Sequence, residues 1–341
     1  MSIIDIDCKN ILSKIQGVEF YKKRILVTGA TGQIGSYLLA YFYHLKKIED
    51  SIRIDAFYST NIPSHLTKYK SLINFKKVNL SEFETLNTES KYDFIVFGAG
   101  YGQPSKFMDN QDATFIINSY GLMSCLSMLR KGGKFLYLST SEIYAGNKIS
   151  DQSENDLITL NPKNKRNSYI LAKLTGEEII KARLNMESDL KIARICLAYG
   201  PGTGLQDTRV LNEFIKKAKI NKKIELLDKG DSIRSYCYVS DTIEMCLRIL
   251  LDGKSAIYNV GNPNQITILG LAKLIARQFG NIKVIFPKNN SDGELNPRTQ
   301  APNIVSINCR KYEKEFGSLD YVKLDDGLIN TITWQEDNIF T

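Results

Sequence analysis

Histidine and tryptophan are scarce in this chain of 341 residues, which contains two histidines and one tryptophan. With so few imidazoles, neither a histidine-based metal centre nor a Ser-His-Asp triad is expected. The six cysteines stand far apart without a Cys-x-x-Cys pair, which favours buried free thiols in a reducing compartment. No uninterrupted apolar run is long enough to span a membrane, and the start of the chain is not typical of a secretory signal. We therefore expect a cytoplasmic protein without a metal ion or a membrane segment.

An excess of acidic residues is also missing, because 45 basic residues face 37 acidic ones and the net charge is +8. The lysines are scattered, so this charge indicates a solvated basic surface that attracts an anionic substrate rather than a nucleic acid. Hydrophobic residues make up 43% and charged residues 24% of the chain, which is ordinary for a globular protein. The length allows one extended domain or two smaller ones.

The most informative stretch runs over residues 24–39, where a short apolar run ends in Thr-Gly and glycines recur at every third position. This pattern predicts a strand, a tight turn and a helix over residues 34–47. Such a turn lets the backbone approach a pyrophosphate and directs a helix N-terminus at it. A turn without a ligand is the alternative, and the flanking strand and helix favour dinucleotide binding. The cofactor contacts predicted in this loop are Gly29, Thr31, Gly32, Gln33, Ile34 and Gly35.

The end of the second strand, predicted over residues 52–58, decides between NAD and NADP. An acidic side chain there binds the ribose hydroxyls of NAD, and its absence leaves room for NADP. Asp55 is the only acid in the strand. It is either the ribose ligand or a surface residue, in which case Tyr58 lies at the ribose. We expect NAD and leave NADP open.

Two further strands, over residues 73–78 and 93–97, end in small or polar residues that suit a cofactor passing close to the backbone. A helix is expected over residues 109–131, ended by Gly132-Gly133. The cofactor candidates in this part of the chain are Asn79, Leu80, Gly98, Ala99, Gly100 and Asn118, and Tyr101 is a candidate substrate contact.

The fifth strand, over residues 135–138, is followed by Thr140, Ser141 and Glu142. Polar residues at the carboxyl end of a strand in an alternating β/α chain are where ligands bind, although a Ser/Thr-rich turn is the simpler interpretation. Tyr169 and Lys173 follow on a helix expected over residues 167–185, and their spacing places them on one helix face. A neighbouring ammonium stabilises a phenolate and brings its pKa toward neutrality, which makes the tyrosine a usable base.

Together the glycine loop, the stretch from Ser139 to Tyr144 and the Tyr-x-x-x-Lys pair resemble the extended short-chain dehydrogenase/reductases, and more narrowly the NAD-dependent nucleotide-sugar epimerase/dehydratase/decarboxylase group. The resemblance covers residues 22–330. It implies that Tyr169 removes a proton from a sugar hydroxyl, most often at C4, while hydride passes to the nicotinamide. It also implies that Lys173 holds the ribose, that Thr140 bonds the reacting hydroxyl, and that the resulting 4-ketone activates the neighbouring bonds.

Three departures from the group's patterns bear on the reaction. Ser141 stands where the 4,6-dehydratases carry an aspartic acid, and the Ser-Glu pair resembles UDP-glucuronate decarboxylases. Those decarboxylases carry an arginine where this chain has Gln300, with Arg298 two residues away, and the usual asparagine after Arg194 is Leu197. A C4 epimerase needs the fewest special groups and is the first choice. A decarboxylase, a dehydratase and a net C4 oxidase or reductase follow, with Glu142 as auxiliary acid or base or as a structural carboxylate.

A non-catalytic NAD(P)-binding regulatory protein is the hypothesis from another class, and the presence of the Tyr-x-x-x-Lys pair argues against it. The substrate implied is a nucleotide-diphosphate sugar. Arg209 and Arg234 are suited to its diphosphate, or else form surface ion pairs, and Arg298 lies in a segment that this group uses to cover the substrate. The resemblance also implies a homodimer.

The expected fold is α/β, with a doubly wound, mainly parallel Rossmann-type sheet and a smaller C-terminal substrate-binding lobe. We expect a helical extension over residues 1–21, the dinucleotide-binding domain over 22–198, and mainly the substrate-binding lobe over 199–330. Some segments of that lobe return to the core, and a tail over 331–341 holds the only tryptophan.

Overall fold

A seven-stranded parallel sheet forms the centre of the computed structural model, which describes residues 1–82, 90–147, 151–160, 163, 166–184, 187–204, 206–287 and 303–340. The strand order is β11-β6-β5-β4-β1-β2-β3. The sheet strands are β1 (Arg24–Thr28), β2 (Arg53–Tyr58), β3 (Asn74–Lys77), β4 (Tyr92–Phe97), β5 (Leu129–Thr140), β6 (Asp189–Ile195) and β11 (Ile257–Val260). The order reverses between β1 and β4, as in doubly wound folds, so the predicted fold class is confirmed.

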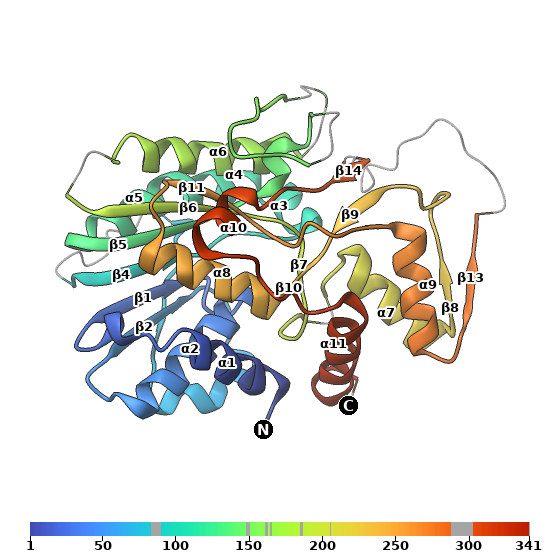
Figure 1. Ribbon diagram of the computed structural model, residues 1–341, viewed down its shortest axis with the longest axis horizontal. Coiled ribbons are helices and arrows are strands. Elements are labelled where there is room, and N and C mark those ends of the chain that lie inside the picture. Colours follow the sequence, from blue (N-terminus) through green and yellow to red (C-terminus); the bar gives the residue numbers. More distant parts are fainter. Residues whose placement is uncertain are drawn as a thin grey trace.

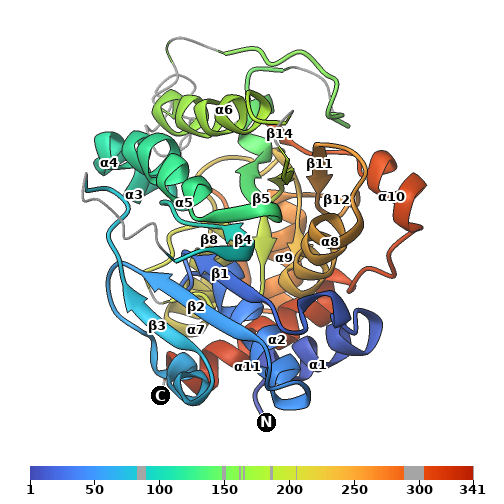
Figure 2. The same cartoon turned by 90° about the vertical axis from the view of Figure 1, so that its left-hand side faces the viewer.

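Helices cover both faces of this sheet (Figures 1 and 2). One layer contains α1 (Ile3–Lys14), α2 (Gln33–Ile48) and α8 (Val239–Asp252). The other contains α4 (Gln111–Ile116), a π-helical segment (Ile117–Gly121), α5 (Leu122–Ser127) and α6 (Asn167–Lys181), with α3 (Pro104–Asp109) beside α6. The strands β1 and β4 are almost entirely buried, and so is β5 from Phe135 on, as strands with helices on both faces must be.

The predicted helix over residues 109–131 is wrong in its extent. The chain there forms α3, α4, the π-helical segment and α5, and the helical structure ends at Ser127. Gly132 and Gly133 lie inside β5 instead, between Leu129, which pairs with Tyr92, and Lys134, which pairs with Phe94. Gly132 has a φ of +74°, so these glycines form an irregularity in a strand and do not end a helix.

A small lobe lies beyond the carboxyl ends of the sheet strands and is drawn at the right of Figure 1. Its helices are α7 (Val210–Asn221), α9 (Ile268–Gln278) and α11 (Leu324–Asn338). Its strands are β8 (Lys223–Glu225), β9 (Ile233–Ser235), β12 (Gln265–Thr267), β13 (Lys283–Ile285) and β14 (Ile304–Val305). The short pair β7 (Ala198–Tyr199) and β10 (Cys237–Tyr238) joins the lobe to the sheet, while α8, β11 and α10 (Arg310–Phe316) return to the larger unit.

Both ends of the chain belong to the packed structure. Helix α1 packs on α2 and α8, and Asp7 of α1 accepts hydrogen bonds from Tyr37 and Tyr238 at 2.7 and 2.9 Å. The boundary predicted at residue 330 falls inside α11, whose Trp334 is 3% exposed and meets the ring of His65 edge-on at 5.3 Å. Among the described residues, no helix is long and apolar enough to cross a membrane.

Candidate active site

Three glycines shape the turn between β1 and α2. Gly29 has a φ of +65°, and a Cβ there would lie 2.3 Å from the carbonyl oxygen of Gly98 on the neighbouring strand's loop. A Cβ on Gly35 would lie 2.3 Å from the carbonyl oxygen of Gly29. Gly32 is the N-cap of α2 and offers no side chain to the first N–H groups of the helix. The turn is therefore a backbone cradle with free donors at a helix N-terminus, which fits the pyrophosphate of a dinucleotide.

Other residues predicted around this cradle have structural partners. The Nε2 of Gln33 donates to the carbonyl oxygens of Gly200 and Pro201 at 2.8 and 3.2 Å, so its side chain ties α2 to the small lobe. Thr31 and Ile34 are half-buried beside it. After β4, the backbone N–H groups of Gly98 and Ala99 donate to Thr28 Oγ1, each at 3.1 Å.

The remaining cofactor candidates lie at the ends of β2, β3 and β4. Tyr58 packs its ring on Phe75, and Leu80 is buried against Gly121. Asn79 accepts hydrogen bonds from the backbone and side chain of Ser81. Asn118 is fully buried in the π-helical segment, where it accepts from Tyr137 Oη at 2.7 Å. Of these four side chains, only that of Asn118 lies beside the loop after β4, with its Nδ2 4.0 Å from a Cβ built on Gly100.

Asp55 does not lie at the carboxyl end of β2. It sits in the middle of the strand opposite Leu26, and its side chain is 7% exposed. One carboxylate oxygen, Oδ2, accepts hydrogen bonds from Arg24 at 2.9 Å, Lys76 at 3.2 Å and Tyr92 at 2.5 Å. The other, Oδ1, accepts from Asn74 at 2.7 Å. These bonds lower the pKa of Asp55 although burial opposes them. The carboxylate joins β1 to β4 and is not free to bind a ribose.

Tyr169 and Thr140 meet where β5 ends. Their side chains are hydrogen-bonded, and the ring of Tyr169 stacks on Phe107 of α3 at 4.3 Å. Burial raises the pKa of Tyr169, the charge of Glu142 adds to the rise, and Thr140, Arg166 and Arg209 oppose it. The pKa of Tyr169 is therefore raised, whereas the sequence predicted that Lys173 would lower it.

Lys173 instead donates to the carbonyl oxygen of Leu138 at 2.9 Å, and burial lowers its pKa to about 8. A Cβ added to Gly100 would lie 3.9 Å from its Nζ, so the loop after β4 reaches this lysine. Lys173 and the glycine cradle therefore border one space at the carboxyl ends of β1, β4 and β5.

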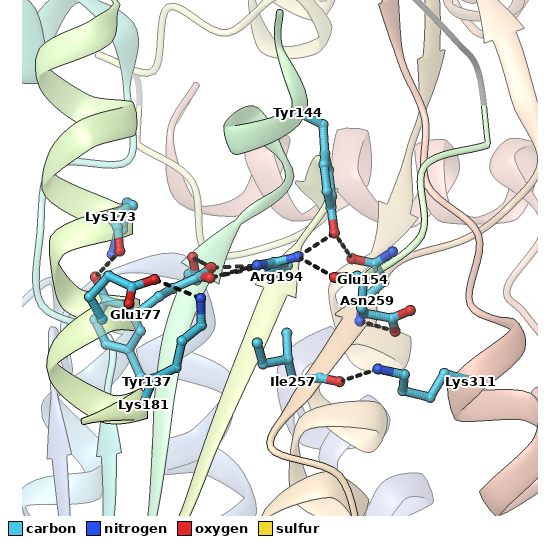
Figure 3. Close-up of polar contacts among 12 residues, drawn as sticks. Tyr137, Tyr144, Glu154, Lys173, Glu177, Lys181, Arg194, Ile257, Asn259 and Lys311 are labelled. Atoms are coloured by element: carbon cyan, nitrogen blue, oxygen red, sulfur yellow. Dashed lines mark hydrogen bonds and ion pairs between the residues drawn. The ribbon is translucent and has the colours of Figure 1, made fainter. Parts of the chain in front are cut away.

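A buried ion pair lies directly beneath Lys173 (Figure 3). Glu177, one helical turn further along α6, binds Arg194 of β6 at 2.7 Å, and their side chains are 0% and 3% exposed. Ser139 of β5 donates to the same carboxylate at 2.6 Å, and Arg194 donates to Tyr144 Oη at 2.7 Å. The charge of Glu177 opposes the lowering of the Lys173 pKa by burial. The sequence analysis missed Glu177, although it stands four residues after Lys173.

The polar residues predicted next to Thr140 both have protein partners. Glu142 forms a two-pronged ion pair with Arg166, whose Nε lies 3.0 Å from Oε2 of Glu142 and whose Nη2 binds Oε1. Ser141 is buried and hydrogen-bonded to the thiol of Cys196. Arg166 was missed from the sequence, where its place one turn before Tyr169 was the available signal.

The candidate substrate residues differ in their surroundings. Arg209 is held by Asp207 at 2.6 Å and also donates to the carbonyl oxygen of Ala198, so its guanidinium is largely satisfied. Arg234 of β9 is 9% exposed, and within the described residues its guanidinium donates to the backbone oxygens of Ile233 and Asn303. Tyr101 is half-buried in the loop after β4. Arg298 and Gln300 lie outside the described residues.

The fold and these side chains define a dinucleotide-dependent enzyme of the Rossmann type. Residues 25–261 match the NAD dependent epimerase/dehydratase family, and the chain belongs to this family. Its cofactor is therefore NAD, as predicted.

Similar proteins carry related activities. The chain is 28% identical to UDP-glucuronic acid decarboxylase 1 of Xenopus tropicalis over 91% of its length and 72% of that protein. It is 28% identical to UDP-glucuronic acid decarboxylase 6 of Arabidopsis thaliana over 93% of its length and 90% of that protein. Among solved structures it resembles an epimerase of Methanothermobacter thermautotrophicus, with 20% identity, 96% coverage of both chains and a TM-score of 0.76. The UDP-glucuronic acid 4-epimerase of Bacillus cereus has 20% identity and a TM-score of 0.72, with 92% of this chain and 99% of that one covered.

The partners of Asp55 predict a structural role that can be separated from cofactor binding. Asp55→Asn removes a buried charge that binds two cations, so the free energy of unfolding should fall by about 2–4 kcal/mol. The NAD affinity of the folded variant should change by less than about twofold. Urea unfolding and titration calorimetry measure the two quantities. Glu187→Gln, in an exposed pair with Lys131, is the control and should cost less than about 1 kcal/mol. A folded Asp55→Asn protein that no longer binds NAD would restore the ribose assignment.

The pKa of Lys173 predicts a pH dependence of cofactor binding. Because burial lowers this pKa to about 8, the ammonium form is dominant below that pH and is lost above it. We expect NAD affinity to fall as the pH rises through 8, by up to about tenfold per pH unit if only the charged form binds. Calorimetric titrations between pH 6.5 and 9.5 test this, and Lys173→Met should give a weaker but flat profile. A flat profile in the unmodified protein would contradict it.

Proposed function

We propose that this protein oxidises C4 of a nucleotide-linked sugar and returns the hydride later in the same catalytic cycle. The observation that carries the proposal is that Tyr169 is hydrogen-bonded to Thr140 at the end of β5, while Lys173 of the same helix lies beside the loop after β4 that contacts the glycine cradle. Bound NAD supplies the hydride acceptor in this space. The substrate class comes from the related proteins, whose names specify UDP-glucuronic acid.

Each residue has a defined task in the first step. Thr140 holds the reacting hydroxyl group beside Tyr169, and Tyr169 takes its proton. Because burial raises the pKa of Tyr169, the phenolate needs positive charge nearby, which Arg166, Arg209 and the bound cofactor supply. Lys173 binds the ribose hydroxyls once its Nζ leaves the carbonyl oxygen of Leu138.

Decarboxylation is the outcome that the curated relatives favour. If C5 of the sugar carries a carboxylate, oxidation at C4 turns the sugar into a β-keto acid. The C5–C6 bond then breaks, carbon dioxide leaves, and the bonding electron pair moves to the C4 oxygen. A proton from solvent is returned to C5, with Glu142 as the candidate group that passes it on. The hydride then returns to C4, and Tyr169 returns its proton to the C4 oxygen. This reaction requires a nucleotide-linked uronic acid.

Epimerisation at C4, the first choice from the sequence, is the second candidate. It is favoured by the small set of groups that it requires, because Tyr169, Thr140 and Lys173 suffice if the keto sugar can rotate. The presence of Ser141 in place of an acid disfavours dehydration, because Ser141 is buried and bonded to Cys196.

The phenol of Tyr169 is the group to remove first. Tyr169→Phe should reduce turnover at least about a hundredfold, the lower range of general-base catalysis, with NAD affinity retained. Mass spectrometry of UDP-, GDP-, CDP- and dTDP-linked sugars incubated in heavy water identifies the product. Loss of carbon dioxide supports decarboxylation, and a retention shift without a mass change supports C4 epimerisation. Gain or loss of two hydrogens would identify a net oxidase or reductase.

Tyr43→Phe on α2, a half-buried tyrosine outside the site, is the control and should keep full activity. Cofactor binding without turnover of any sugar in either protein would favour the non-catalytic regulatory alternative.

We also propose that the protein is a homodimer formed through α4, α5 and α6. These helices lie together on one face of the sheet (Figure 2) and expose apolar side chains, with Phe115 at 36%, Met123 at 40% and Leu171 at 40%. Exposed apolar groups on adjacent helices are typical of an interface between subunits.

Light scattering tests the dimer at micromolar concentration. Leu171→Glu should convert a dimer into a folded monomer, because a charge in an apolar interface is left without a partner. Ile220→Glu, at an exposed position on α7, should leave the dimer intact. A monomer in the unmodified protein would refute the proposal.

A further inference from the structure

Positive charge exceeds negative charge around Tyr169. The charges of Arg166 and Arg209 act on Tyr169, and Arg234 lies close enough to Arg166 to feel its charge. The carboxylates paired with these arginines are Glu142 and Asp207. Asp207 holds Arg209 in a closed pair at 2.6 Å, and Glu142 holds Arg166. Arg234 has no carboxylate partner in the part of the chain that the structure describes, because its Nη1 donates to the backbone oxygens of Ile233 and Asn303. Since buried charges require partners, the positive charge of Arg234, unpaired among the described residues, favours the binding of an additional anion near these arginines.

The pair of Glu142 and Arg166 is the one closest to the reacting groups. Its side chains are 15% and 7% exposed, and the guanidinium lies 5.3 Å from the centre of the Phe107 ring. The same ring stacks on Tyr169 with an angle of 8° between the planes. One aromatic ring therefore separates Arg166 from the proposed base. With the C4 hydroxyl at Tyr169, as proposed, a carboxylate on the neighbouring C5 lies close to the charges of Glu142 and Arg166, both of which act on Tyr169.

Arg234 has no carboxylate partner among the described residues, and it is the alternative partner that we assign to Glu142. The charge of Glu142 acts on Arg234 as well as on Tyr169, and the charge of Arg166 repels Arg234. If another carboxylate binds Arg166, Glu142 can turn toward Arg234. After that exchange Arg166 is paired with the incoming carboxylate, and Arg234 is paired with Glu142.

We propose that Arg166 binds the carboxylate of a nucleotide-linked uronic acid, and that this carboxylate displaces Glu142 toward Arg234. The inference rests on the proposed function and deepens it, because it makes Arg166 the residue that selects acidic over neutral sugars. No bond forms or breaks in the exchange, since the only change is which carboxylate accepts from the guanidinium. A neutral hexose lacks the competing carboxylate and leaves the pair of Glu142 and Arg166 closed.

The exchange predicts opposite effects of two substitutions on binding. Both are made in Tyr169→Phe protein saturated with NAD, so that binding is measured without turnover, and calorimetry compares UDP-glucuronate with UDP-glucose. Arg166→Gln should weaken UDP-glucuronate about tenfold to a hundredfold, the usual effect of losing hydrogen bonds to a charged group. Glu142→Gln should tighten UDP-glucuronate, because its competitor is gone. UDP-glucose should change less than about threefold in both variants.

Lys181→Gln, which removes one positive charge from the exposed side of the same helix, is the matched control and should affect neither sugar. Thermal unfolding and NAD affinity verify that each variant is folded. If Arg166→Gln does not fold, Arg166→Lys and Glu142→Gln carry the test. Equal losses for the two sugars, or weaker UDP-glucuronate binding in Glu142→Gln, would overturn the inference. If neither sugar binds the Tyr169→Phe parent, the proposed substrate class fails, and the inference falls with it.

Discussion

The buried pair of Glu177 and Arg194 is the interaction on which the arrangement of the site depends. It joins α6, which carries Tyr169 and Lys173, to β6, and through Ser139 it also fixes β5. A charge pair with side chains 0% and 3% exposed is stable only if its remaining hydrogen-bonding positions are filled. Ser139 and Tyr144 fill them, and Tyr144 in turn donates to Asn259 of β11. The helix that carries the proposed base is thereby held in register with three strands.

A second constraint is the close approach of two backbone loops. Gly29 and Gly98 follow β1 and β4, the strands between which the sheet order reverses, and the space between them excludes a Cβ. Side chains cannot occupy this place, so the backbone itself lines it. The free N–H groups of α2 then face a ligand that arrives along the strand ends. The Tyr169 side of the site begins one strand further on, at the end of β5.

The small lobe is joined to the cofactor-binding unit by side chains and not by the connecting loops alone. Helix α11 places Leu328 and Ile332 in the core of the lobe and Trp334 in the core beside α2. Gln335 donates to Thr203 and Asn212 at 3.3 and 2.9 Å. Together with Gln33 of α2, these contacts hold the loop around Gly200 between the two units. The C-terminal helix therefore sets how the lobe sits over the strand ends.

The sequence by itself determined the glycine cradle, the alternation of strands and helices, and the position of Tyr169 and Lys173 one turn apart on the same helix. Each of these is a local pattern, because a turn that needs positive φ requires glycine and a spacing of four residues places two side chains on one helix face. The same local reasoning failed for Gly132 and Gly133, since a glycine pair ends a helix or bends a strand with equal ease.

Only the tertiary structure decided which charges meet. Asp55 is a structural ligand because Arg24, Asn74, Lys76 and Tyr92 converge on it from three other strands. The pKa of Tyr169 is raised because burial outweighs the neighbouring cations. Glu142 pairs with Arg166 and Asp207 with Arg209, and Arg234 has no acidic partner in the described part of the chain, although the three arginines cannot be told apart in the sequence. Burial and ion pairing depend on contacts between residues that are far apart along the chain. A local sequence pattern does not show which of these residues come together.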